Sequence, residues 1–347
     1  MTRRGFLNAV LGALAVIGLW VGLGTTPTCS AQGAKGLARA LFVQERHTNN
    51  LMAKNGVVGT GVGLDARGRY VVKVYVVAPQ DAAGIAKKLD GVPVSVRVSG
   101  VILALKRPPG KGKPSVDPTA RFDRPVPIGV STGHPDITAG TIGCRVFDAY
   151  GVYALSNNHV YANENQAAIT DFVIQPGTFD GGSSSDDDIG MLYAFKPIVF
   201  SIFANNQIDA AIAVTSTDVV GNSTPSDGYG SPEAVTIAAS PGMKVVKYGR
   251  TTGQTKGQVD AINATVNIGY DSGVARFVKQ IIITPGGFSA PGDSGSLIVA
   301  NDKKGKKEGP NHRKPVGLLF AGSATHTIAN PIDLVLDEFG VVIDVGP

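Results

Sequence analysis

Residues 290–297 read Ala-Pro-Gly-Asp-Ser-Gly-Ser-Leu. They place Ser294 directly after a Gly-Asp pair and directly before Gly295, so little Cβ bulk restricts the backbone around this serine. Consecutive amide groups in such a turn can point toward one spot and bind an oxygen anion there. The letters Gly-Asp-Ser-Gly also occur in ordinary turns, so their interpretation depends on what else the chain supplies.

His159 follows a predicted strand and a polar turn, so its imidazole could be both held in place and accessible. The apolar run 152–155 precedes it and predicts a strand, and the polar residues 156–158 predict a turn. Taken alone, His159 would be read as a structural histidine. Together with Ser294 it becomes a candidate general base, because a serine hydroxyl is a weak nucleophile until a base activates it.

The carboxylate that would orient His159 has two candidates. Asp209 begins the apolar segment 209–213, where a buried carboxylate without a partner would be costly. Asp188 ends an acidic run that is more typical of a solvated loop, and it is the alternative. With Asp209 the chain order is His, Asp, Ser, which is the order of chymotrypsin-type triads and not that of α/β-hydrolases.

Four ordered segments resemble the trypsin-like, chymotrypsin-fold serine proteases. They are Leu-Ser-Asn-Asn-His-Val at 155–160, Ile-Asp-Ala-Ala-Ile-Ala at 208–213, Lys-Tyr-Gly-Arg-Thr-Thr-Gly at 247–253 and Gly-Asp-Ser-Gly-Ser at 292–296. The resemblance covers about 125 to 347. It is nearest to bacterial exported proteins of this type with an N-terminal α+β module, and to the plant narrow-leaf protease domain.

The resemblance implies a mainly β fold, with two six-stranded barrels divided near 215–235 and the site between them. Ser294 would attack a peptide carbonyl, His159 would act as general base and then acid, and Asp209 would orient the imidazole. The amides of Gly292 and Ser294 would form the oxyanion hole. We therefore expect a serine endopeptidase that acts on protein or peptide substrates without a metal or cofactor. The alternative is a protease-fold module that binds proteins or peptides without cleaving them.

The resemblance also places the substrate groove. An extended substrate would pair with the strand at 316–323. The residues expected to contact it there are Phe320, Ala321, Gly322 and Ser323. Phe288 would stand at the base of the primary pocket, which favours a small or shallow pocket over one for Lys or Arg. His326 either lines this pocket or is a surface histidine, and the absence of an Ile-Val-Gly-Gly activation sequence leaves the partner of Asp293 open.

The N-terminal region divides into a targeting segment, a small module and a linker. Residues 1–31 resemble a twin-arginine export signal, which predicts a periplasmic or extracellular protein. The apolar run 9–24 is alternatively an uncleaved membrane anchor. Residues 34–106 predict an α+β module that serves as a pro-domain, a spacer or a partner-binding domain, and residues 107–124 a Pro-rich linker.

Local patterns predict the elements of this module. Helices are expected at 37–52 and 79–89, and strands at 57–64, 70–77, 94–98 and 101–105. Many short strands follow the linker, and only residues 331–339 predict a helix there.

Composition narrows the function classes. A hydrophobic share of 43% with 17% charged residues excludes a disordered chain, and 45 glycines and 21 prolines suit short strands joined by turns. The net charge of +5 comes mainly from two basic loops, at 106–113 and 303–314, which we interpret as solvated and not as a nucleic-acid surface. Cys144 is expected to be a buried small hydrophobe, and no cluster has metal-ligand spacing. Nothing in the pattern predicts an oligomeric state.

Overall fold

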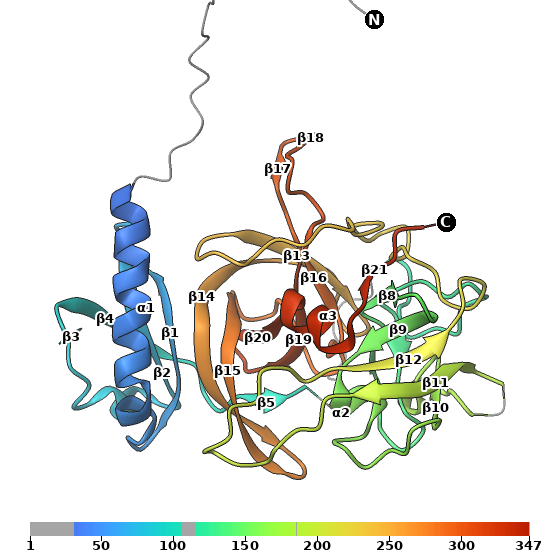
Figure 1. Cartoon of the computed structure of the whole chain (residues 1–347), viewed down its shortest axis with the longest axis horizontal. Coiled ribbons are helices and arrows are strands. Elements are labelled where there is room, and N and C mark those ends of the chain that lie inside the picture. The colour runs from blue at the N-terminus through green and yellow to red at the C-terminus, as the bar shows by residue number, and fades with distance from the viewer. Residues whose placement is uncertain (1–30, 106–114, 185, 347) are drawn as a thin grey trace, which may run out of the picture.

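The computed structural model describes residues 31–105, 115–184 and 186–346. The fold is mainly β, as predicted, and consists of two six-stranded antiparallel units and an N-terminal α+β part (Figure 1). Nearly all of the predicted export segment, including the possible anchor at 9–24, lies outside the described residues, as does 107–114 of the predicted linker. Among the residues that are described, no helix is both long and apolar enough to cross a membrane.

The first unit is an antiparallel sheet in the order β10-β11-β12-β9-β8-β21. Its strands are β8 (Cys144–Phe147), β9 (Val152–Ser156), β10 (Phe172–Ile174), β11 (Asp188–Phe195), β12 (Ala211–Thr215) and β21 (Val342–Ile343). A two-stranded ribbon, β6 (Ser131–Thr132) and β7 (Gly140–Thr141), and two short helices, α2 (Asn158–Tyr161) and η2 (Thr178–Asp180), accompany it. Because β21 comes from the C-terminal end and pairs with β8, the end of the chain returns to the first unit.

The second unit is a closed barrel. Its strands are β13 (Lys244–Gly249), β14 (Gly253–Tyr270), β15 (Gly273–Thr284), β16 (Leu297–Ala300), β19 (Pro315–Gly322) and β20 (Thr327–Pro331). They follow the order β13-β16-β19-β20-β15-β14, and the pairing of β13 with β14 closes the ring. A basic hairpin, β17 (Lys303–Lys304) and β18 (Lys307–Glu308), projects from this barrel (Figure 1).

The N-terminal part extends the sheet of the second barrel. It contains α1 (Ala31–Met52), β1 (Val57–Leu64), β2 (Tyr70–Val76), η1 (Pro79–Ala82), β3 (Lys88–Leu89) and β4 (Val92–Val98). Strand β1 pairs with β14, and α1 covers the outer side of β1 and β2 (Figure 1). Asp260 of β14 accepts hydrogen bonds from Lys73 and, at 2.7 Å, from the Tyr75 hydroxyl. This part is therefore joined to the barrel by a continuous sheet and a largely buried ion pair.

One predicted element of this part is wrong and another is shorter than expected. The helix expected at 79–89 ends after the single turn η1, because Ala83 is already extended, with φ −62° and ψ 136°, and Gly84 then takes a φ of +74°, far from the helical value. The strand expected at 101–105 is the two-residue β5 (Leu103–Ala104). The helix expected at 37–52 is confirmed within α1, and the one at 331–339 as α3 (Ile332–Phe339).

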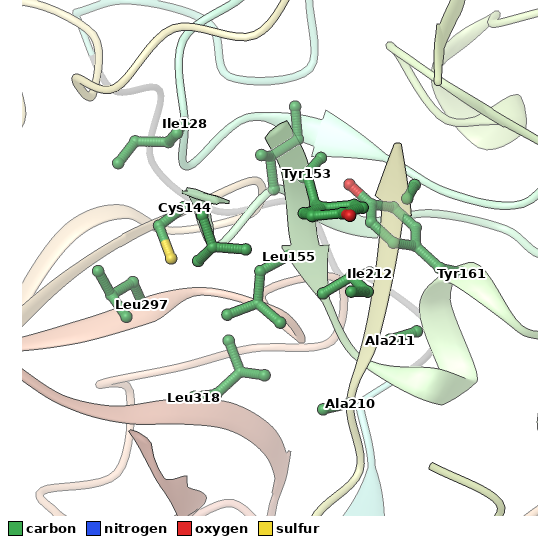
Figure 2. Close-up of a cluster of buried hydrophobic side chains, with 14 of the residues drawn as sticks. Ile128, Cys144, Tyr153, Leu155, Tyr161, Ala210, Ala211, Ile212, Leu297 and Leu318 are labelled. Carbon is green, nitrogen blue, oxygen red and sulfur yellow. The ribbon is translucent and has the colours of Figure 1, made fainter. Parts of the chain in front are cut away.

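A single hydrophobic core joins the two six-stranded units. Cys144 and Leu155 of the first unit belong to the same buried cluster as Leu297 and Leu318 of the second (Figure 2). Cys144 is fully buried, as predicted, and burial raises the pKa of its thiol. Interiors packed in this way change little in shape, so the shared core holds side chains of one unit in register with those of the other.

Candidate active site

His159 and Asp209 meet at the edge of the first unit. The imidazole Nδ1 lies 2.6 Å from Asp209 Oδ2, and the backbone amide of His159 donates to Asp209 Oδ1 at 3.2 Å. His159 stands on α2 directly after β9, and Asp209 lies just before β12, the strand that pairs with β9. The structure thus brings Asp209, and not Asp188, against His159. Asp188 begins β11, and burial raises the pKa of its carboxyl.

The polar residues before His159 lie inside the protein and do not form an open turn. Asn157 donates its side-chain amide to the carbonyl of Asp209 at 2.7 Å, and Asn158 donates to the carbonyl of Lys196 at 2.7 Å. Both asparagines are fully buried. Buried polar groups need such partners, and here the partners fix the imidazole beside its carboxylate.

Tyr270 is a contact of Asp209 that the sequence patterns did not reveal. Its hydroxyl, at the end of β14, donates to Asp209 Oδ2 at 2.8 Å. Burial and then the Asp209 charge raise the pKa of this phenol well above its ordinary value, so it stays a donor. Asn330 of β20 accepts from the Asp209 amide at 3.1 Å. The second barrel therefore supports a carboxylate that the first unit supplies.

The turn around Ser294 has the backbone that its glycines suggested. Gly292 and Gly295 adopt φ of +96° and +93°, which residues with a Cβ rarely adopt. A Cβ on Gly292 would lie 2.5 Å from the Thr251 hydroxyl, and one on Gly295 would lie 2.2 Å from the Thr141 carbonyl oxygen. Glycine is therefore required at both positions for reasons of φ and of space.

Lys247 is the partner of Asp293 that the sequence left open. Its ammonium donates to Asp293 Oδ2 at 3.0 Å, and both side chains have no exposed surface. Asp293 also accepts from Thr252 Oγ1 at 2.7 Å and from the amides of Thr251 and Ala290 at 2.8 and 2.9 Å. Burial lowers the pKa of Lys247, and the Asp293 carboxylate opposes this shift. An internal ion pair thus holds the turn of Ser294.

The Ser294 hydroxyl lies among backbone carbonyls. Its Oγ is 3.3 Å from the carbonyl oxygen of Phe320 and 3.4 Å from that of Leu105. His159 Nε2 is buried and has no hydrogen-bond partner among the described residues. A nitrogen in this state can accept a proton from a hydroxyl that turns toward it.

The groove expected to receive a substrate contains a segment of the same chain. β5 pairs antiparallel with the end of β19, with Ala104 opposite Ala321 and Leu103 opposite Gly322. The Gly292 amide donates to the Leu105 carbonyl oxygen at 2.8 Å. Ala321 and Gly322 therefore lie opposite this segment, and Phe320 shares a buried hydrophobic cluster with Ile102. Ser323, a further predicted contact, lies beyond the paired residues, and its amide donates to the His326 carbonyl at 2.8 Å.

The predicted pocket residues Phe288 and His326 differ in their surroundings. Phe288 is fully buried in a hydrophobic cluster that also contains Leu105 and Leu319. His326 packs edge-on against the Tyr75 ring, with 5.2 Å between ring centroids, and its Nδ1 lies 2.8 Å from Thr325 Oγ1. Burial lowers the pKa of His326. His326 therefore contacts the N-terminal part through the Tyr75 ring.

A hollow of about 390 Å³ lies beside His159. It is lined by His159, Val160, Ala139 and Asn163, among others. Within the described ranges no group of three or more His, Cys, Asp or Glu side chains is arranged to hold a metal ion.

Comparisons with known proteins found one family model that matches part of this chain and several solved protease structures that are similar to it. The family model of the Nal1 C-terminal domain matches residues 206–333, which is well under half of the chain. A glutamic acid-specific serine protease that uses a histidine triad in substrate binding is 20% identical, with a TM-score of 0.43, over 63% of this chain and 100% of that one. Protease A of Thermobifida fusca is 19% identical, with a TM-score of 0.44, over 64% of this chain and 100% of that protein. The chymotrypsin of Cellulomonas bogoriensis is 19% identical, with a TM-score of 0.43, over 65% of this chain and 100% of that protein.

Proposed function

We propose that this chain, a trypsin-like protease-fold protein, is a serine endopeptidase. Ser294 is the proposed nucleophile, His159 the general base and acid, and Asp209 the group that orients the imidazole. The contact between His159 Nδ1 and Asp209 Oδ2, at 2.6 Å, supports the last of these roles because it leaves Nε2 free to take a proton.

One observation carries the proposal: a peptide carbonyl already lies in the proposed oxyanion hole. The Gly292 amide donates to the Leu105 carbonyl oxygen at 2.8 Å, and Ser294 Oγ lies 3.4 Å from the same oxygen. An amide placed there stabilises the negative charge that develops when a serine adds to a carbonyl. Loss of one such donor typically lowers kcat by about 10²- to 10³-fold.

The proposed reaction has two halves. Ser294 Oγ adds to the substrate carbonyl carbon as its proton passes to His159 Nε2, and the carbon–nitrogen bond then breaks as that proton passes to the leaving amine. Water then attacks the acyl ester with His159 again as base, which releases a carboxylate and restores the serine. Asp209 stays ionised throughout and stabilises the imidazolium, with Tyr270 holding one of its oxygens.

Labelling with a fluorophosphonate probe tests this function. We expect an adduct on Ser294, mapped by mass spectrometry, and no adduct in the Ser294→Ala or His159→Ala variants. Because the chain's own segment fills the groove, the same labelling is done with Leu105→Asp, whose charge disfavours the apolar pocket. If Leu105→Asp is folded and Ser294 still does not react, the chain is a protease-fold binding module and not an enzyme.

We also propose that the chain is exported, on the sequence pattern of residues 1–31. The mass of the protein recovered outside the cytoplasm tests this proposal. A chain that starts near residue 32 indicates signal cleavage, an intact membrane-bound chain indicates an anchor, and retention in the cytoplasm contradicts export.

A further inference from the structure

Residues 102–105 have the features of a bound peptide. β5 runs antiparallel to the end of β19, in the direction in which an extended peptide adds to a sheet edge. Leu103 and Ala104 form the ladder, and the next carbonyl, that of Leu105, is the one at the Gly292 amide. The segment therefore ends its pairing where the proposed chemistry begins.

The side chains of this segment are buried to different degrees. Leu105 is 7% exposed and packs in the cluster of Phe288, whereas Leu103, two residues earlier, is 50% exposed. Side chains two apart in an extended chain share a face, but the strand pairing ends between these two residues, so only Leu105 reaches the pocket. The pocket accordingly holds one branched apolar side chain of the size of leucine.

We propose that the chain cleaves itself on the carboxyl side of Leu105, and that the segment 102–105 then stays in the groove as a bound product. This inference rests on the proposed function, since the same Ser294 and His159 perform the cut. It assigns a processing site within the chain. It also assigns a preference for leucine, or an apolar residue of similar size, on the acyl side of the bond that is cut.

The chemistry balances with water as the only co-reactant. Ser294 Oγ forms an ester with the Leu105 carbonyl carbon, and the bond to the nitrogen of residue 106 breaks. That nitrogen takes the serine proton by way of His159 and becomes a new amino terminus. Water hydrolyses the ester, which leaves a Leu105 carboxylate beside the Gly292 amide.

The N-terminal part is expected to stay attached after the cut. Its contacts with the barrel do not depend on the linker: β1 pairs with β14, and Lys73 and Tyr75 both bond to Asp260. Asn263 of the barrel also donates to the Gln44 side chain at 3.0 Å. The product is therefore a two-chain complex whose groove is still filled by its own segment.

Intact-mass spectrometry of the purified full chain tests the proposal. We expect wild type to give two co-purifying chains, one ending at Leu105 and one beginning at residue 106, and Ser294→Ala to give one uncut chain. Leu105→Asp should lose the cut because a carboxylate does not suit the apolar pocket. Val101→Asp is the matched control, because Val101 is 55% exposed and precedes the paired segment, and it should be cut as wild type is. Leu105→Ala provides a second variant should Leu105→Asp fail to fold, and it should be cut more slowly.

The outcomes separate this inference from the proposed function. A wild-type chain that stays uncut while Leu105→Asp reacts with a fluorophosphonate at Ser294 overturns self-cleavage and leaves the peptidase proposal standing. A cut that also appears in Ser294→Ala comes from another protease and overturns self-cleavage too. A folded Leu105→Asp chain that does not react at Ser294 overturns both.

Discussion

Replacing Lys247 by methionine removes the only side-chain cation that bonds to Asp293 among the described residues. Methionine keeps most of the length of the side chain and fills the same buried space, so the change removes mainly the charge. The Asp293 carboxylate is then left buried without an opposite charge, in the turn that carries the Gly292 amide and Ser294.

The size of the effect follows from the partners of Asp293. Loss of one member of a buried ion pair typically lowers the free energy of unfolding by about 3–5 kcal/mol. Asp293 keeps its bonds from the Thr252 hydroxyl and from the amides of Thr251, Thr252 and Ala290. Because these donors still stabilise the charge, we expect a loss near about 3 kcal/mol, at the lower end of that range.

Urea unfolding measures this loss. It is done in the Ser294→Ala background, so that proteolysis does not distort the transition. Lys244→Met is the matched control, because Lys244 begins the same strand but is exposed, and we expect it to change stability by less than about 0.5 kcal/mol. Adding Asp293→Asn to Lys247→Met should cost less than the sum of the single changes, with a coupling of about 0.5–3 kcal/mol.

Two results would refute this reasoning. One is a loss for Lys247→Met that equals the loss for Lys244→Met. The other is strict additivity of Lys247→Met with Asp293→Asn. Either would mean that the ion pair does not hold the turn of Ser294.

Three further predictions concern the site and its support. Tyr270→Phe removes a charge-assisted bond to Asp209, and we expect kcat/KM for peptide hydrolysis to fall about tenfold, or ~1.4 kcal/mol, in steady-state assays. Gly292→Ala forces a Cβ against Thr251 and displaces the Gly292 amide, so kcat should fall by about 10²- to 10³-fold. Circular dichroism should show that the variant is folded, and an unchanged kcat would exclude this amide from catalysis. Burial would raise the pKa of Asp260, but the bonds from Lys73 and Tyr75 leave it lowered in the folded protein. The resulting stability is present above the unfolded pKa of about 3.9 and lost as pH falls below it, so thermal melting should show a smaller acid-induced loss for Asp260→Asn than for wild type.

Much of the fold follows from local patterns. Short apolar runs between turn residues predicted the strands, and the resemblance to chymotrypsin-fold proteases implied how the two units meet. The prediction of a helix at 79–89 was wrong because it rested on helical composition, whereas the backbone becomes extended at Ala83 and left-handed at Gly84. Propensity is a weak predictor where one residue decides the backbone path.

The site was less predictable because its supports come from distant parts of the chain. Lys247 lies 46 positions from Asp293, and nothing local indicates that a lysine within a strand is buried against a carboxylate. Tyr270 lies 61 positions from Asp209. The run 101–105 was recognisable as a strand, but its partner was not, since sequence pattern does not specify which sheet edge a short strand joins.

The most direct test of the central claim is hydrolysis of a peptide that copies the bound segment. The substrate is Ile-Leu-Ala-Leu, the sequence of residues 102–105, joined through its last carboxyl to a fluorogenic amine, and the enzyme is Leu105→Asp. We predict release of the amine after the final leucine, and no release when Ser294→Ala is added. Folded enzyme that releases no more amine than its Ser294→Ala counterpart would contradict the assignment of this groove as the active site of a peptidase.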